Sequence, residues 1–151
     1  MQCMAEALGM ALPGNALVPA TMRDLTEYSR KAGKQVVRLA KAGITPSMIM
    51  TKEAFRNAIV VHSAIGGSTN ALIHLPAIAK ELGIELDPEL FNEINRKIPH
   101  IGNVNPSGKH LTESFWFAGG IPMVQITLKD HLDLDVLTAV SYTHLTLPTK
   151  A

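Results

Sequence analysis

Residues 53–75 read EAFRNAIVVHSAIGGSTNALIHL, and this stretch decides the fold. One polar turn is followed by AIVVHSAI over residues 58–65, which is apolar on nearly every side and is therefore expected to be buried. Gly66 and Gly67 break the apolar run, and Ser68 is placed to cap a helix over residues 69–82. The stretch predicts a buried core segment, a tight turn and a second helix.

The flanking sequence predicts further helices. Apolar residues recur at three- and four-residue steps, and glycines and prolines separate the segments. The predicted helices cover residues 1–10, 21–43 with Thr21 as the N-cap, and 87–99. By contrast, the alternation HLDLDVL over residues 131–137 predicts a short strand. The predicted fold class is therefore mostly α-helical, with few short strands.

The composition excludes several classes of protein. The chain has 151 residues, of which 46% are apolar and 18% are charged, as in a globular domain. The 14 basic and 13 acidic residues leave a net charge of +1, so no nucleic-acid partner is expected. No apolar run reaches the roughly 18 residues that a bilayer requires, and the first residues lack the basic start of a signal peptide. No membrane partner is expected.

The chain contains a single cysteine, Cys3. One cysteine forms no internal disulfide and no multi-cysteine zinc or iron–sulfur site, so a reducing, cytoplasmic setting is expected. No paired His and Asn arrangement marks Cys3 as a nucleophile, and the cysteine is interpreted as a packed small residue.

The glycine pair and the three polar residues after it form the strongest local candidate for a binding site. Gly66 and Gly67 allow a close approach of the backbone to a ligand, while Ser68, Thr69 and Asn70 place hydroxyls, an amide and backbone donors at a helix N-terminus. Such an end attracts a carboxylate or phosphate. The alternative is a purely structural glycine break with an N-cap serine, which the spacing alone favours.

Other polar residues also allow two interpretations. His62 and His74 flank the glycine pair, where a metal or acid–base role competes with a buried imidazole bonded to backbone, which the apolar neighbours favour. In the predicted strand, His131, Asp133 and Asp135 share one face, which suits a cation or a solvated edge.

The turn PSGKH over residues 106–110 offers a hydroxyl and Lys109 to an anionic group. The alternative, a surface turn with a solvated lysine, is favoured by the composition of the turn.

Residues 140–151, VSYTHLTLPTKA, follow no pattern set earlier in the chain. The peptide VSYTHL is typical of a translated sequencing adapter, and the segment is interpreted as a non-native tail. The alternative is an ordinary strand and tail. Native sequence is thus expected over residues 1–139.

Several segments together resemble a known family of dehydratases, which contains dihydroxy-acid dehydratase, 6-phosphogluconate dehydratase and the aldonic-acid dehydratases. The matching segments, in the order and spacing of that family, are MQCMAEALGMALPGNA at 1–16, AGKQVV at 32–37, the long stretch at 49–79, IPHIGNVNPSGKHL at 98–111 and FAGGIP at 117–122. The resemblance implies a partial N-terminal α/β domain over residues 1–139, corresponding to the C-terminal half of that domain.

The resemblance also implies an activity. Members of the family remove water from 2,3-dihydroxy carboxylic acids to give 2-keto acids, with an iron–sulfur cluster and, in many members, Mg²⁺. The family's third cluster cysteine precedes a TAN(S/T)M sequence whose Met corresponds to Met1, so Cys3 is not assigned as a ligand. The CDK motif and the C-terminal domain with its serine base have no counterpart here. The chain is therefore expected to be an internal fragment that is inactive alone, poorly soluble and without bound iron or magnesium.

Within that fragment the resemblance assigns substrate binding to the polar end of the loop and pocket support to its glycines; no catalytic residue and no metal ligand are expected. The assigned residues are Ser68, Thr69 and Asn70 for substrate, and Gly66 and Gly67 for support. The longer parent is expected to be a cytoplasmic homodimer or homotetramer acting on a small dihydroxy acid. Two alternatives stay open: a fragment of a sugar-acid dehydratase, and a stand-alone helical scaffold or binding module.

Overall fold

Helix α4 (Lys52–Ile65) is the centre of the computed structural model, which describes residues 1–140. The helix begins after Thr51, whose hydroxyl oxygen accepts a hydrogen bond from the Ala54 N–H at 3.3 Å. It ends at Gly66, which adopts the left-handed conformation with φ of 62°. Phe55 and Ile59 are 0% exposed, so the predicted buried core segment is confirmed.

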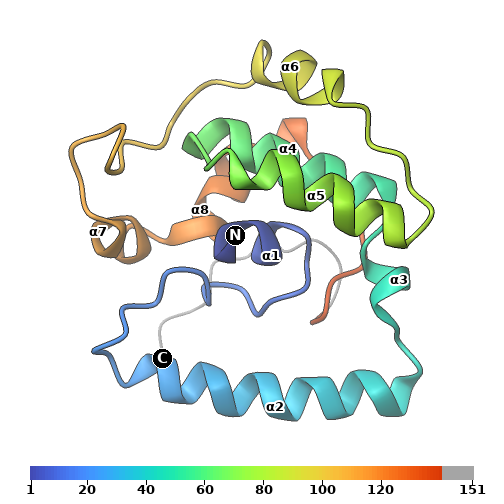
Figure 1. Ribbon diagram of the computed structural model, residues 1–151. Coiled ribbons are helices and arrows are strands. Elements are labelled where there is room, and N and C mark those ends of the chain that lie inside the picture. Colours follow the sequence, from blue (N-terminus) through green and yellow to red (C-terminus); the bar gives the residue numbers. More distant parts are fainter. Residues whose placement is uncertain (141–151) are drawn as a thin grey trace.

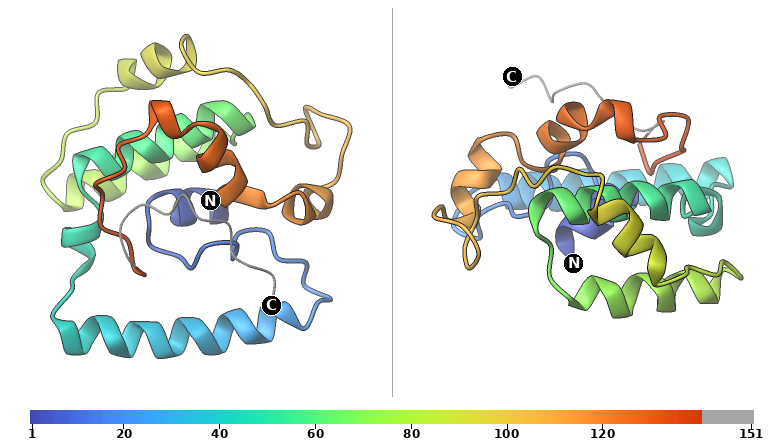
Figure 2. Two further views of the ribbon diagram at one scale, coloured as in Figure 1. Left: turned by 180° about the vertical axis from the view of Figure 1, so that it is seen from behind. Right: turned by 90° about the horizontal axis from the view of Figure 1, so that it is seen from above.

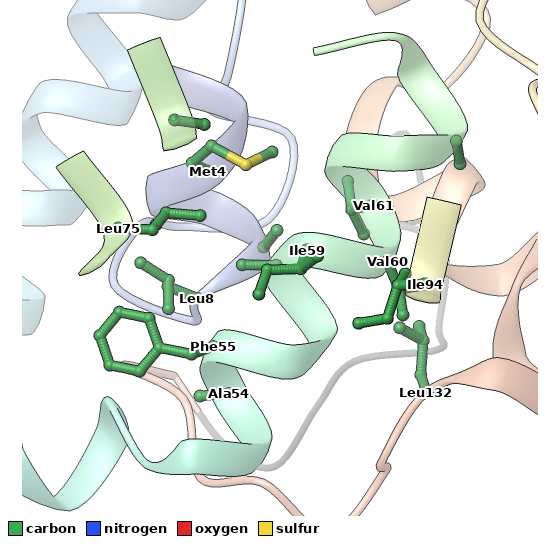
Figure 3. Packing of buried hydrophobic residues seen from close by; sticks show 14 of the residues in the cluster. Met4, Leu8, Ala54, Phe55, Ile59, Val60, Val61, Leu75, Ile94 and Leu132 are labelled. Carbon is green, nitrogen blue, oxygen red and sulfur yellow. The ribbon is translucent and has the colours of Figure 1, made fainter. Parts of the chain in front are cut away.

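Helices surround α4 on several sides, as its apolar sequence requires. The helices packed against it are α1 (Gln2–Ala7), α5 (Asn70–Glu81), α6 (Glu89–Asn95) and α8 (Gly120–Thr127) (Figure 1, Figure 2). The first three lie within the ranges predicted at 1–10, 69–82 and 87–99. Figure 3 shows the resulting core, where Met4 and Leu8 lie beside Phe55 and Ile59 of α4. Each such buried side chain stabilises the fold by about 1.5–3 kcal/mol.

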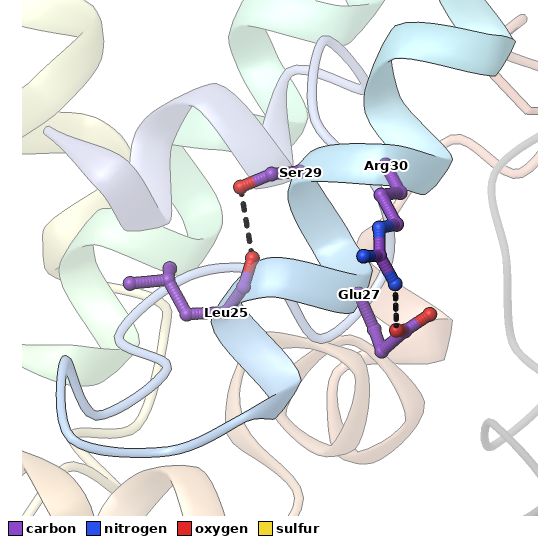
Figure 4. A network of polar contacts seen from close by, with 4 residues as sticks. All are labelled: Leu25, Glu27, Ser29 and Arg30. Atoms are coloured by element: carbon purple, nitrogen blue, oxygen red, sulfur yellow. Dashed lines mark hydrogen bonds and ion pairs between the residues drawn. The ribbon is translucent and has the colours of Figure 1, made fainter.

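Helix α2 (Asp24–Ala42) lies apart from this core, along one edge of the molecule (Figure 1). It has no buried residue, and Val36 is 61% exposed. Bonds along its own surface support it: the Ser29 hydroxyl donates to the Leu25 carbonyl at 2.8 Å, and Arg30 pairs with Glu27 at 2.9 Å (Figure 4).

The predicted start of this helix at Thr21 is wrong. The preceding turn is stabilised by a bond from the Met22 N–H to the Pro19 carbonyl, so the helical ladder begins only after Arg23. The predicted end at Gly43 is confirmed, because Gly43 caps the helix in the left-handed conformation.

The remaining helices are short, and residues 131–137 do not form the predicted strand. Helix α3 (Pro46–Ile49), helix α7 (Thr112–Phe117) and a 3₁₀ turn at Lys129–His131 complete the helical elements of residues 1–140. Within the same residues, the expected strands are reduced to isolated bridge residues, namely Val104 paired with His110, and Leu137. Residues 131–137 form no strand because the side chain of Asn57 takes the backbone N–H and C=O of Asp133.

The fold is mostly helical, as predicted. Over residues 1–140, no helix is both long enough and apolar enough to cross a membrane. The predicted non-native tail over residues 140–151 lies, from residue 141 onward, outside the described residues and stays a prediction.

Candidate functional site

The loop that joins α4 to α5 is a tight turn which only small residues fit. The N–H of Gly67 donates to the His62 carbonyl at 2.9 Å, closing the C-terminus of α4. A Cβ atom on Gly67 would overlap the imidazole ring of His62, and one on Gly66 would lie 2.7 Å from Cε1 of His100. The two glycines therefore allow the backbone to pass between two imidazole rings.

His62 holds this loop from inside the turn. Its Nε2 lies 3.0 Å from the Ser68 carbonyl, and because a carbonyl only accepts, Nε2 is the donor. The ring also packs edge-on against Phe91 at 6.2 Å between centroids. The favoured interpretation of His62, an imidazole bonded to backbone, is confirmed, although the ring is only half-buried. His74 is exposed on α5, so its predicted burial is wrong.

The polar residues of the loop are accessible to a ligand. Ser68, Thr69 and Asn70 are all exposed, and the Ser68 hydroxyl oxygen accepts from the Asn70 N–H at 3.3 Å. This contact lies at the start of α5, where backbone N–H groups and the helix dipole favour negative charge. The N-cap of α5 is Thr69, so the predicted cap at Ser68 is one residue too early. Ser68 instead bonds the first N–H of the helix from the position before the cap, and its hydroxyl retains the capacity to donate to a ligand.

A second loop lies against the first. The N–H groups of Ile101 and Gly102 both donate to the carbonyl of Ala64, at 2.8 and 3.0 Å, near the C-terminus of α4. These bonds bring residues 104–107 to the Gly66–Ser68 turn. In the sequence, 35 residues separate the two segments.

A cavity of about 200 Å³ lies between these loops. Ser68, Ser107 and Thr112, each of which carries a hydroxyl group, are among its lining residues. Apolar side chains form much of the rest of the wall, and they come from the N-terminal helix region, the following loop and α7: Met1, Met4, Leu17 and Phe115. Such a cavity is suited to a small molecule with a polar and an apolar part.

The structure brings together some of the predicted site residues and separates others. Gly66, Gly67 and Ser68 line the cavity, whereas Thr69 and Asn70 do not. From the PSGKH turn, Pro106 and Ser107 line the cavity and Lys109 is exposed outside it, as the favoured surface interpretation of the lysine predicted.

Cys3 also lines the cavity, packed against the core. Burial raises the pKa of its thiol, an effect that the positive charge of the N-terminus partly opposes. The thiol is therefore neutral near pH 7, unlike the thiolate that binds a metal or attacks a substrate. The interpretation of Cys3 as a packed residue is confirmed.

The described residues do not form a metal centre. Within residues 1–140, no three His, Cys, Asp or Glu side chains come close enough together to hold an ion. His131 and Asp135 are exposed, and the Asp133 carboxylate accepts from the Asp135 N–H at 3.2 Å. Because no strand forms, these side chains do not share the face that the cation alternative required.

Two structurally important residues, Leu17 of the cavity wall and Glu6 of α1, carry little signal in the sequence. Leu17 contributes to the wall from an irregular loop, and no sequence pattern marks it. Glu6 is a buried carboxylate on α1, only 5% exposed, and a single acid among the apolar residues of positions 3–8 was the available signal.

The described residues thus form a helical domain with a small cavity of mixed polarity. Residues 1–146 match the family described as dihydroxy-acid/6-phosphogluconate dehydratase, N-terminal. The chain belongs to this family.

Individual relatives agree with this assignment. The chain is 47% identical over 145 residues to a dihydroxy-acid dehydratase of Halothermothrix orenii, covering 95% of this chain and 26% of the relative. It is 43% identical over 144 residues to that of Methanothermobacter thermautotrophicus, covering 95% and 26%. It is 49% identical over 132 residues to that of Thermodesulfovibrio yellowstonii, covering 87% and 24%. The chain thus spans about a quarter of the length of these curated relatives.

Proposed function

We propose that the chain is part of a hydro-lyase that converts 2,3-dihydroxy carboxylic acids into 2-keto acids, and that the cavity holds part of the substrate. The observation that carries this proposal is that the Gly66–Ser68 turn and residues 104–107 line the same cavity. Both segments belong to the motifs that resemble the dehydratase family, and the packing against Ala64 brings them to one cavity.

The residues of the cavity support two roles in such a reaction. Ser68, at the start of α5, is placed to donate to a substrate carboxylate, helped by the helix dipole. Ser107 and Thr112 add hydroxyl groups for the substrate hydroxyls. Leu17 and Phe115 offer an apolar wall to the carbon skeleton and exclude water from it. The chain thus binds and orients the substrate, and no group in it is assigned to the proton transfer.

The iron–sulfur cluster and Mg²⁺ of the family are proposed for the longer parent protein only. The residues described here do not fit either group, because Cys3 is a neutral, packed thiol and no set of three ligands converges. The parent is likewise proposed to be a cytoplasmic homodimer or homotetramer. The chain alone is proposed to be inactive.

A chimeric enzyme tests the proposed function. Residues 1–139 would replace the matching quarter of the Halothermothrix orenii dihydroxy-acid dehydratase, and the purified chimera would be assayed with 2,3-dihydroxyisovalerate and with a panel of aldonates. We expect turnover of 2,3-dihydroxyisovalerate. Turnover of aldonates alone would establish the sugar-acid alternative instead.

The unmodified Halothermothrix enzyme is the control for assembly. A chimera that folds and carries its cluster like this control, yet dehydrates none of the acids, would contradict the proposed function. It would favour the alternative of a scaffold or binding module.

A further inference from the structure

The carboxylate of Glu6 is bonded to the loop that follows α1. Its Oε1 accepts from the Gly14 N–H and its Oε2 from the Ala16 N–H, both at 2.6 Å. Both oxygens therefore act as acceptors at once. An ionised carboxylate satisfies two donors in this way, whereas a protonated one carries a hydrogen on one oxygen and loses an acceptor.

Two other helices hold the same loop, residues 13–17. The indole Nε1–H of Trp116 in α7 donates to the Gly14 carbonyl at 2.8 Å, and the Tyr28 hydroxyl in α2 donates to the Pro13 carbonyl at 3.2 Å. The loop is thus bonded from α1, α2 and α7. Of these, α1 and α7 also contribute side chains to the cavity.

The 13–17 loop ends at Leu17, which lines the cavity in an unusual conformation. Its φ is 65°, in the left-handed region that a leucine rarely adopts. A residue keeps such a conformation only when its surroundings hold it there. The bonds to Gly14 and Ala16 lie one to three residues before Leu17 and supply this restraint.

We propose that Glu6 is a positioning residue of the cavity: its ionised carboxylate holds the 13–17 loop so that Leu17 forms part of the wall, and protonation releases that wall. The effect of Glu6 on catalysis rests on the proposed function, whereas its effect on the position of the 13–17 loop does not. Nothing in this role requires Glu6 to touch the substrate.

The environment of Glu6 places the protonation of its carboxylate near neutral pH. Burial raises the pKa of Glu6 to about 7, although the backbone N–H bonds act in the opposite direction. The titratable groups that face it are the Cys3 thiol on α1 and the Tyr28 hydroxyl on α2, and the charge of Glu6 contributes to the raised pKa of each. The ion pair formed among residues 1–140 is that of Arg30 with Glu27, so within this range no lysine, arginine or histidine pairs with Glu6.

Hydrogen exchange read by mass spectrometry tests the proposal in the 151-residue chain. The readout is the protection factor of a peptide covering residues 11–18, corrected for the intrinsic pH dependence of exchange. We expect this protection to fall about tenfold between pH 8 and pH 6, the effect of losing one hydrogen bond to a charged group. Protection of residues 54–64 in α4 should stay constant. Weak protection of residues 11–18 at pH 8, or protection that does not change with pH, would overturn the proposal.

Variants separate the role of Glu6 from a general loss of structure. Glu6→Gln should give low protection of residues 11–18 at every pH, while Glu113→Gln, an exposed carboxyl on α7, should behave like the unmodified chain. If Glu6→Gln also lowers the protection of residues 54–64 in α4, this variant has lost structure generally, and Trp116→Phe then provides the test. That variant keeps Glu6 and should show weaker protection of residues 11–18 with an unchanged pH midpoint; loss of the pH dependence would contradict the proposal.

Kinetics of the chimera distinguish failure of this inference from failure of the proposed function. In an active chimera, Glu6→Gln should raise KM with a smaller effect on kcat, and should remove a step near pH 7 from the KM profile. An unchanged KM profile would overturn the positioning role while leaving the dehydratase activity established. An inactive chimera whose exchange still depends on Glu6 would contradict the dehydratase function alone.

Discussion

The side-chain amide of Asn57 pairs with both backbone groups of Asp133. Its Nδ2 donates to the Asp133 carbonyl at 2.7 Å, and its Oδ1 accepts from the Asp133 N–H at 2.9 Å. Asn57 lies in the middle of α4 and is 1% exposed. This pair fixes the C-terminal segment against the central helix, and the buried Leu132 beside it adds apolar contact.

Asn57→Ala is therefore expected to destabilise the chain by about 2–3 kcal/mol. The change removes two hydrogen bonds and leaves the backbone groups of Asp133 without their partner. Urea unfolding followed by circular dichroism measures the loss. The matched control is Asn92→Ala, because the Asn92 side chain is exposed on α6 and donates to the exposed Glu89 carboxylate; it should change stability by less than about 0.5 kcal/mol. Equal effects of the two changes would contradict the role of Asn57.

The Asn57 pair also explains why part of the fold could not be predicted from the sequence. Helices α4 and α5 follow from local signals, namely the apolar run and the glycines that end it. The alternation of residues 131–137 is equally regular, but a side chain 76 residues away takes the backbone groups that a strand would need. Local pattern carries no information on such a long-range bond.

Local sequence signals likewise predict only part of the candidate site. The glycine pair and Ser68 carry a local signal, because small residues before a helix mark a turn and a cap. Leu17 and Phe115 reach the same cavity through the packing of a loop and of α7, which periodicity does not describe. Thr69 and Asn70 share the local signal of Ser68 but lie outside the cavity lining, since the turn into α5 directs only part of the segment toward it.

Gly67→Ala is expected to destabilise the chain by about 1–3 kcal/mol, because the new methyl group would overlap His62 and force the ring away from the Ser68 carbonyl. Thermal unfolding measures the loss. Gly33→Ala in α2 is the matched control, since no atom lies within 4 Å of the added Cβ and alanine favours a helix. The control should be neutral or stabilising by up to about 1 kcal/mol. A Gly67→Ala protein as stable as the control would show that His62 does not restrict the turn.

Ser68→Ala should lower kcat/KM of the active chimera about tenfold or more. The substitution removes a hydroxyl group proposed to donate to the substrate carboxylate, and a hydrogen bond to a charged group contributes about 1.5–3 kcal/mol. Steady-state kinetics with 2,3-dihydroxyisovalerate provide the measurement. Ser47→Ala is the control, because Ser47 lies on α3, away from the cavity, and is exposed. Full activity of the Ser68→Ala chimera would remove Ser68 from the substrate site.

Glu6→Gln should change how the stability of the chain depends on pH. Burial raises the pKa of Glu6 from 4.5 to about 7 in the folded state, so the folded chain retains this proton over a range where the unfolded chain has lost it. The contribution of Glu6 to stability is therefore fully present below pH 4.5 and is lost as the pH rises to about 7. At about 1.4 kcal/mol per unit of pKa, the loss amounts to about 3 kcal/mol.

Glutamine does not titrate, so the stability of Glu6→Gln relative to the unmodified chain should rise by this amount between pH 4.5 and pH 7.5. Urea unfolding at several pH values measures the difference, and Glu113→Gln should follow the unmodified chain throughout. When the 13–17 loop is released while α1 stays packed in the core, Glu6 keeps its burial and loses only the two bonds that favour the ionised form, so protonation favours release of the loop. Complete unfolding removes the burial as well, so protonation favours the folded chain over the unfolded one. A difference that stays constant with pH would mean that Glu6 titrates alike in the folded and unfolded chains, and that its burial does not govern its protonation.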